Sequence, residues 1–183
     1  MTARVILLNG VGSAGKSSIA AELQKIAARS FLHVKMDDFF AMTPPALMGR
    51  PDGFVFEPTE IDGRSAVEIR EGAKGRLIME AMRAAVFAMA ETGCDLIVDD
   101  VLIGDERRSY PALLSAFELS VVGVHASLAA LEAREAARGD RLIGLARWQY
   151  GRVHEGVAYD FEVRTDAMSA AECAASICKA LSL

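Results

Sequence analysis

The stretch Gly10-Val11-Gly12-Ser13-Ala14-Gly15-Lys16-Ser17 decides the fold of this chain. It fits the pattern G-x-x-x-x-G-K-[ST], in which glycines let the backbone turn so tightly that several N–H groups point to one place. The apolar run at residues 5–8 before it is typical of a buried parallel strand. Apolar residues recur after it at helical spacing, at Ile19, Leu23 and Ile26. A chance glycine-rich turn needs no such flanks, so we interpret the stretch as a phosphate-binding loop.

The chemistry of the loop follows from its place before a helix. The N-terminus of a helix carries partial positive charge and favours phosphate oxygens. Lys16 is expected to reach the β- and γ-phosphates, and the Ser17 hydroxyl to bind Mg²⁺. The sequence thus predicts a nucleoside triphosphate site formed by nine residues, namely Gly10, Val11, Gly12, Ser13, Ala14, Gly15, Lys16, Ser17 and Ser18.

Composition indicates one globular domain spanning residues 1–183, because hydrophobic residues make up 52% and charged residues 25% of the chain. The net charge of −5, without any Lys or Arg run, argues against a nucleic-acid partner. Cys94, Cys173 and Cys178 have no metal-ligand spacing, so we expect reduced thiols. No apolar stretch reaches the roughly 18 residues of a membrane span or forms a signal-peptide core. We therefore expect a cytoplasmic protein with no membrane partner.

Strands and helices alternate along the chain. Short apolar runs predict strands at 4–9, 31–36, 96–98, 119–124 and 160–164. Helical patterns cover 16–28, 66–92, 105–116 and 127–138, and two more begin near 142 and 169. This order predicts a three-layer α/β fold with a parallel five-stranded sheet. Ligands of such sheets bind beyond the carboxyl ends of the strands, where the loop and two pairs of acids should meet.

The segment from about 41 to 64 is rich in proline and glycine, so we expect an irregular structure there. Phenylalanines and methionines cluster in and just before it, and core packing could account for some of them. An apolar pocket for an acceptor molecule is the alternative. On that interpretation the residues that contact the acceptor are Asp38, Phe39, Phe40, Met42, Phe54 and Phe56.

Asp37 and Asp38 follow the second strand. Phosphoryl transfer to an alcohol gains from a carboxylate that orients the hydroxyl and accepts its proton. Either acid could instead cap a helix before Phe39 and Phe40. We predict that one of the two is catalytic, with Asp37 as the candidate.

Asp99 and Asp100 end the third strand, which has the form of a Walker B strand. There an acid holds Mg²⁺ directly or through water. We predict that at least one of these acids joins Ser17 in the metal shell. A role for Asp100 in binding substrate stays open.

Three arginines indicate a small helical lid at about 134–150. Arg134 and Arg138 are four residues apart on one helical face, and Gly139 offers a hinge before Arg141. Arginines that close over a transferring phosphoryl group stabilise its charge. The alternative is a surface helix held by ion pairs to Glu132 and Glu135.

Several of these motifs together resemble the chloramphenicol 3-O-phosphotransferase family. The resemblance rests on the loop, Asp37, Val98-Asp99-Asp100-Val101, Arg138-Gly139-Asp140-Arg141 and Val153-His154-Glu155-Gly156-Val157 followed by Tyr159-Asp160. It implies a P-loop fold like that of adenylate or shikimate kinase, with ATP and Mg²⁺ as the donor system. It also implies phosphorylation of the primary hydroxyl of chloramphenicol, with Asp37 as base, Lys16 on the phosphates and the arginines as a clamp.

Other functions stay open. The segment 41–63 is richer in proline and aromatic residues than its counterpart in that family, so the acceptor could be a sugar, a nucleoside or a nucleotide sugar, as in zeta-toxin-like kinases. A nucleotide-dependent switch with no acceptor is the alternative from another class, although it would not need Asp37. The sequence leaves open whether the protein is a monomer or a homo-oligomer.

Overall fold

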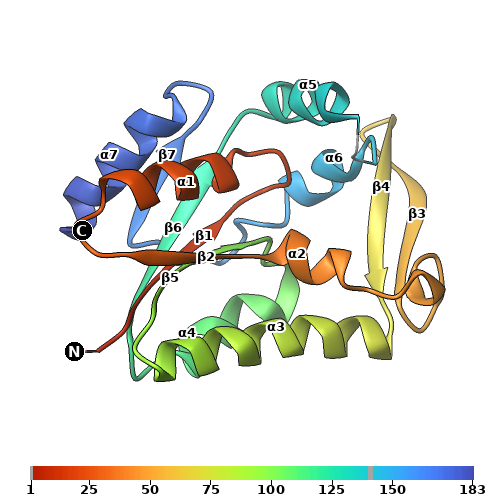
Figure 1. Cartoon of the computed structure of the whole chain (residues 1–183). Coiled ribbons are helices and arrows are strands. Elements are labelled where there is room, and N and C mark those ends of the chain that lie inside the picture. Colours follow the sequence, from red (N-terminus) through yellow and green to blue (C-terminus); the bar gives the residue numbers. More distant parts are fainter. Residues whose placement is uncertain (1, 140–141) are drawn as a thin grey trace.

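A parallel sheet of five strands forms the centre of the protein. The computed structural model describes residues 2–139 and 142–183 (Figure 1). The strands stand in the order β2-β5-β1-β6-β7 and all neighbours are parallel. Their bounds are β1 Arg4–Asn9, β2 Phe31–Lys35, β5 Asp95–Asp100, β6 Glu118–His125 and β7 Phe161–Arg164. The fold class predicted from the alternating pattern is thereby confirmed.

Helices cover both faces of this sheet. Helices α1 (Lys16–Ile26) and α7 (Ala170–Leu181) lie on one face, and α3 (Ala73–Glu91) and α4 (Ser109–Leu113) lie on the other (Figure 1). The remaining helices lie beyond the carboxyl ends of the strands and in the loops, namely α2 Met36–Ala41, α5 Leu128–Arg138, α6 Leu145–Tyr150 and the 3₁₀ turns Pro45–Leu47 and Gly104–Arg108. None of the described helices is long and apolar enough to cross a membrane.

The core has two halves because side chains of β1 alternate between the two faces. Ile6 and Leu8 are fully buried against the cluster that contains Leu23 of α1. Val5 and Leu7 point the opposite way, into the cluster built around α3 and α4. A strand buried on both faces needs a continuous apolar run, which is what the sequence shows before the phosphate loop.

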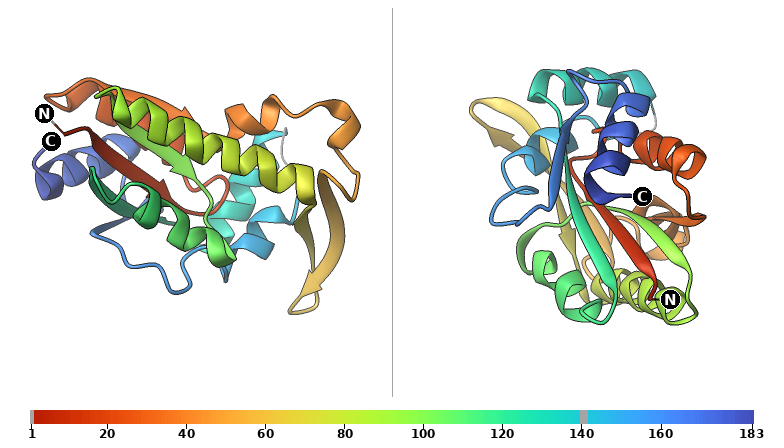
Figure 2. Two further views of the ribbon diagram at one scale, coloured as in Figure 1. Left: turned by 90° about the horizontal axis from the view of Figure 1, so that it is seen from below. Right: turned by 90° about the vertical axis from the view of Figure 1, so that its left-hand side faces the viewer.

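The prediction of an irregular segment at about 41–64 is confirmed for residues 42–53, where the only named element is the 3₁₀ turn Pro45–Leu47, but it is wrong from residue 54 on. Strands β3 (Phe54–Ile61) and β4 (Arg64–Glu71) form an antiparallel hairpin. Figure 2 shows it projecting from the end of the molecule that lies opposite both termini. Asp62 and Gly63 at its turn have φ of 52° and 68°, the positive values that a two-residue hairpin turn requires. The Asp-Gly pair is therefore the turn of a hairpin rather than a general breaker of structure.

The helix expected from 66 begins later, because its first residues belong to β4. Helix α3 starts at Ala73 and buries Met82 and Val86, whereas Leu77 is 62% exposed. The segment expected to be helical at 105–116 consists of a 3₁₀ turn followed by the short α4. Only the β4 boundary changes the architecture, because it adds a two-stranded wall beside the main sheet.

Asn9 fastens a distant part of the chain to the end of β1. Its Nδ2 donates to Val153 O at 2.9 Å and to Tyr159 Oη at 2.7 Å, while its Oδ1 accepts from Leu102 N at 2.9 Å. The Tyr159 hydroxyl lies 2.6 Å from His154 Nδ1. Because Tyr159 accepts from Asn9, its own proton is directed to His154. This network holds the residue that directly precedes the phosphate loop.

The half-buried His154 predicts a pH dependence of stability. Burial, with further contributions from His125 and Lys16, lowers the pKa of His154 from 6.5 to about 4. Because the folded pKa is the lower one, the unfolded chain binds this proton first, so the contribution of neutral His154 to stability is lost as pH falls from 6.5 towards 4. We expect the free energy of unfolding of His154→Gln to fall less over this range than that of the wild type, measured by urea denaturation. Parallel pH profiles of the two proteins would contradict this.

Candidate active site

The phosphate loop sits between β1 and α1, with its amides at the N-terminus of an 11-residue helix. Gly15, the N-cap of α1, has φ of 94°, a left-handed value that glycine adopts without strain. Gly10 is needed for space, since a Cβ there would lie 2.4 Å from Val124 O of β6. With these two glycines the loop backbone adopts the concave shape, lined by N–H groups, that binds phosphate groups in proteins.

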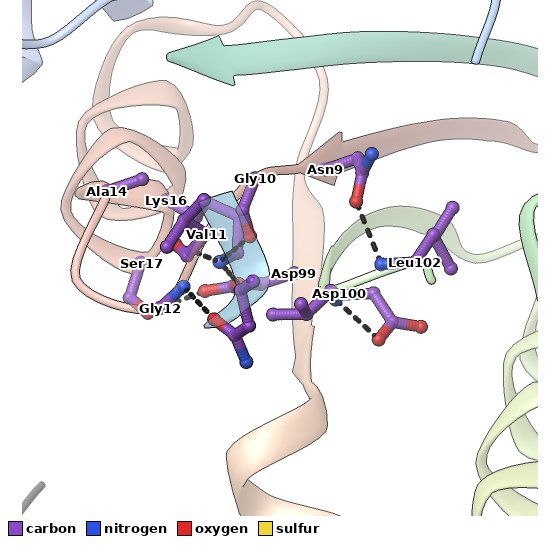
Figure 3. A network of polar contacts seen from close by, with 12 residues as sticks. Asn9, Gly10, Val11, Gly12, Ala14, Lys16, Ser17, Asp99, Asp100 and Leu102 are labelled. Carbon is purple, nitrogen blue, oxygen red and sulfur yellow. Dashed lines mark hydrogen bonds and ion pairs between the residues drawn. The ribbon is translucent and has the colours of Figure 1, made fainter. Parts of the chain in front are cut away.

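Lys16 lies inside this loop and is only 6% exposed. Its Nζ donates to Gly10 O at 2.8 Å and to Val11 O at 3.1 Å, and it lies 3.6 Å from Asp99 Oδ1 (Figure 3). A buried ammonium requires such partners because removing it from water is costly. The loop carbonyls and one carboxylate therefore fix the charge of Lys16 at the mouth of the loop.

Ser17 and Asp99 form an oxygen pair beside Lys16. The Ser17 hydroxyl donates to Asp99 Oδ2 at 2.5 Å. Burial by itself raises the pKa of Asp99, but Lys16, the nearby His33 and the hydrogen bond from Ser17 bring the pKa below its ordinary value. Asp99 is therefore a carboxylate at neutral pH. A hydroxyl and a carboxylate are oxygen ligands of the kind that Mg²⁺ prefers.

Asp100 does not join this pair. Its carboxylate accepts from its neighbour Val101 N at 2.7 Å and from Tyr110 Oη at 3.0 Å, and Figure 3 shows it directed away from Ser17. Successive side chains of a strand point to opposite faces, so adjacent acids cannot both face the loop. Burial raises the pKa of Asp100 to about 6. Of the two acids predicted as metal ligands, the structure brings only Asp99 to the loop.

The structure also separates Asp37 from Asp38. Both lie in the first turn of α2, and the N-cap is Lys35 without a side-chain cap, so neither acid caps the helix. Asp37 lines a cavity of about 830 Å³ together with Lys16, Ser17 and Asp99. Asp38 is exposed and pairs with Lys35 at 2.9 Å. Asp37 is therefore the acid that shares a space with the phosphate loop.

One wall of this cavity is apolar. It is formed by Met36, Phe40, Met48, Phe56, Ile69 and Val101. Two of these residues come from the β3–β4 hairpin and two from α2, and Met48 lies just before the hairpin. The cavity thus joins a polar phosphate loop to an apolar surface large enough to contact a ring.

The predicted acceptor residues divide between this wall and other places. Phe40 and Phe56 line the cavity, but Phe54 is fully buried with its ring centroid 4.3 Å from that of Phe40. Phe39 packs against the core beside α3, and Met42 is 66% exposed. A cluster in sequence therefore contributes only part of itself to the pocket. Phe54 and Phe56 share a face of β3, but Phe54 packs against Phe40 and is fully buried, so only Phe56 lines the cavity.

The predicted lid begins with Arg134, which is docked on Thr165. Its Nη1 donates to Thr165 Oγ1 at 2.9 Å and its Nη2 to Thr165 O at 2.7 Å. Arg134 and Arg138, one turn apart on α5, both line the cavity. Arg141 lies outside the described residues. Thr165 also donates to Ala14 O at 2.8 Å, so the arginine and the phosphate loop share an anchor.

The two nearby glutamates, Glu132 and Glu135, have partners on α6 and in the turn before it. Glu132 pairs with Arg147. Glu135 is 4% exposed, and its carboxylate accepts from Gly144 N at 2.7 Å and Ala146 N at 2.8 Å. It therefore joins α5 to the start of α6.

Sequence reasoning missed Glu135, Thr165 and Gln149, all of which line the cavity. Gln149 of α6 accepts from Gly12 N at 2.8 Å and is 5% exposed. A signal existed for Glu135, because it follows the buried Leu131 by four residues and so occupies the apolar face of α5. Gln149 and Thr165 lie in no recognisable pattern, and only the folding of distant segments brings them to the loop.

Comparison with known proteins agrees with this geometry. The sequence profile of the family described as Chloramphenicol phosphotransferase-like protein matches residues 3–182. Two curated proteins of Mycobacterium tuberculosis, from strains CDC 1551 / Oshkosh and ATCC 25618 / H37Rv, are each 34% identical over 179 residues. The match covers 93% of this chain and 79% of each relative, and both relatives carry provisional names as O-phosphotransferases.

Solved structures show the same fold at low sequence identity. An APS kinase from Mycobacterium tuberculosis in complex with AMPPNP and APS has a TM-score of 0.66 at 13% identity, covering 100% of this chain and 99% of that chain. A gluconokinase from Sinorhizobium meliloti 1021 has a TM-score of 0.61 at 16% identity, covering 99% and 92%. These neighbours share the P-loop kinase fold. Because the matched profile spans nearly the whole sequence, the chain belongs to the chloramphenicol phosphotransferase-like family of P-loop phosphotransferases.

Proposed function

We propose that this protein is an ATP-dependent O-phosphotransferase that phosphorylates the primary hydroxyl of chloramphenicol or of a closely related alcohol. The observation that carries the proposal is the shared cavity. It is lined by Lys16, Ser17 and Asp99 on the donor side, and by Asp37 and an apolar wall on the other side. A carboxylate facing a phosphate loop across one space suits transfer to a hydroxyl group.

The donor side fits ATP with Mg²⁺. The loop amides and Lys16 would hold the phosphates, and Ser17 with Asp99 would supply two oxygen ligands to the metal. Within the described residues there is no group of three or more His, Cys, Asp and Glu that could hold a metal alone. That agrees with Mg²⁺, which keeps several waters and binds phosphate oxygens besides one or two protein ligands. The ion, when bound, neutralises charge on the phosphates.

The acceptor side favours an alcohol that carries an aromatic or other apolar group. Asp37 would orient the hydroxyl and accept its proton late in the transfer. Phe40, Phe56 and Ile69 would contact the apolar part of the acceptor. A sugar or a nucleotide sugar would need several polar partners, and this wall offers few. Arg134 and Arg138 would stabilise the charge of the moving phosphoryl group.

A switch without an acceptor is the alternative from another class. It would need the phosphate loop and Asp99 but neither Asp37 nor the apolar wall. The proposal of a kinase accounts for both halves of the cavity, and its test is a substrate panel.

For the panel, we expect ADP release with Mg-ATP to depend on chloramphenicol and to stay near background with simple sugars and nucleosides, measured in a coupled assay. The expected preference follows from the apolar wall, which rewards burial of a ring. The Lys16→Ala variant serves as the inactive control. Sugar-dependent turnover would contradict the acceptor class, and ATP hydrolysis that no acceptor stimulates would favour the switch.

Asp37 and Asp38 form a matched pair for the catalytic role. We expect Asp37→Asn to lower the acceptor-dependent kcat by about 100-fold or more, because a general base typically contributes that much. ATP binding, measured by calorimetry, should change little in this variant. Asp38→Asn should retain activity near that of the wild type, since Asp38 is exposed and lies outside the cavity wall. If Asp38→Asn lost activity and Asp37→Asn kept it, the assignment of Asp37 as the base would be wrong.

Asp99 and Asp100 form a second pair, for the metal. In Asp99→Asn we expect the Mg²⁺ concentration needed for half-maximal binding of AMP-PNP to rise by at least about tenfold, because a charged oxygen ligand is lost. In Asp100→Asn it should stay unchanged, since Asp100 contacts Tyr110 instead. The measurement is a calorimetric titration at a series of Mg²⁺ concentrations. Equal shifts in both variants would contradict the placement of Asp99.

A further inference from the structure

Helix α6 contacts the β3–β4 hairpin, α5 and the phosphate loop although it has only six residues. Its beginning is attached to the hairpin, because Val67 N of β4 donates to Gly144 O at 3.1 Å. The backbone of Gly144 is pressed against that strand so closely that a Cβ would lie 2.9 Å from Ala66 Cα. Glu135 ties the same end of the helix to α5. The N-terminal end of α6 thus follows the position of the acceptor hairpin.

The other end of α6 is attached to the phosphate loop. The Gln149 side chain accepts the Gly12 N–H, and the Gln149 carbonyl accepts from Val153 N at 3.0 Å. Val153 O in turn accepts from Asn9, the residue before the loop. The C-terminal end of α6 therefore contacts the turn of the phosphate loop directly, through Gly12. It is connected to the residue before the loop, Asn9, through Val153.

The chemistry of Gln149 suits a contact beside bound phosphate. The Gly12 N–H must have an acceptor when it is out of water, and the loop itself does not supply one. A carboxylate at this place would repel phosphate charge, whereas the amide oxygen accepts without a net charge. The position of the loop consequently depends on where α6 holds Gln149.

We propose that Gln149 is a positioning residue that couples nucleotide in the phosphate loop to the β3–β4 hairpin through α6. The inference rests on the proposed function in one respect, that residues 10–18 bind ATP. Nucleotide orders the loop, and the contact of Gly12 with Gln149 then restricts α6. The contact of Gly144 with Val67 in turn restricts the hairpin. By thermodynamic linkage, the hairpin then influences the loop by the same coupling free energy.

The test is amide hydrogen exchange followed by NMR in the full chain, with and without AMP-PNP and Mg²⁺. In the nucleotide-free protein, Gln149→Met keeps the side-chain volume but loses the acceptor. We expect the Gly12 amide to exchange between about twofold and tenfold faster in this variant, the range that one net hydrogen bond allows. Gln149→Glu, which restores an acceptor, should keep the wild-type rate.

The coupling itself is read at Val67. In the wild type we expect AMP-PNP to slow exchange at Val67 as well as in residues 10–18. In Gln149→Met, and in Gln149→Asn, which is one methylene too short to reach Gly12, the effect at Val67 should be lost while that in the loop persists. The neighbouring exposed Tyr150 provides the control, because Tyr150→Leu should behave like the wild type.

The outcomes separate the two proposals. Slowing at Val67 that persists in both Gln149→Met and Gln149→Asn, or that is absent from the wild type despite bound AMP-PNP, overturns the coupling and leaves the proposed function intact. A wild type that fails to bind AMP-PNP overturns both. The exchange rate of the Gly12 amide in Gln149→Glu is the control for folding. A wild-type rate in that variant requires a native loop.

Discussion

The contact on which the rest of this site depends is that of Lys16 with the phosphate loop and Asp99. A buried ammonium must be surrounded by acceptors, and here two loop carbonyls and one carboxylate provide them. This requirement ties the carbonyls of the loop and the start of α1 to the end of β5, which carries the carboxylate. The same carboxylate then orders Ser17. One charged contact thus joins the parts that a nucleotide and its metal would use.

A second constraint is geometric, and it decides which of two adjacent acids can act. Alternation along β5 turns Asp99 to the loop and Asp100 to Tyr110, and the helical turn of α2 turns Asp37 to the cavity and leaves Asp38 exposed. Both pairs look equivalent as letters in a sequence. The fold distinguishes their members through direction alone.

The sequence predicted the sheet, its helices and the loop because these depend on local periodicity and on one motif of fixed spacing. It did not predict the hairpin, because the prolines and glycines in residues 41–64 obscured the strand pattern of β3. The two strands are neighbours in sequence, and their turn is formed by Asp62 and Gly63. Gln149 and Thr165 were also beyond reach, because long-range folding alone brings them to the loop. Of the phenylalanines predicted to contact an acceptor, Phe40 and Phe56 line the cavity, whereas Phe54 lies in the core.

We propose that a hydroxyl bound between the apolar wall and Asp37 receives a phosphoryl group from a nucleotide held by the loop. The product formed from Mg-ATP and chloramphenicol, identified by mass spectrometry and by phosphorus NMR, tests this proposal. We expect chloramphenicol that carries one phosphoryl group on its primary hydroxyl. Unmodified chloramphenicol alongside a protein that binds and consumes ATP would contradict it.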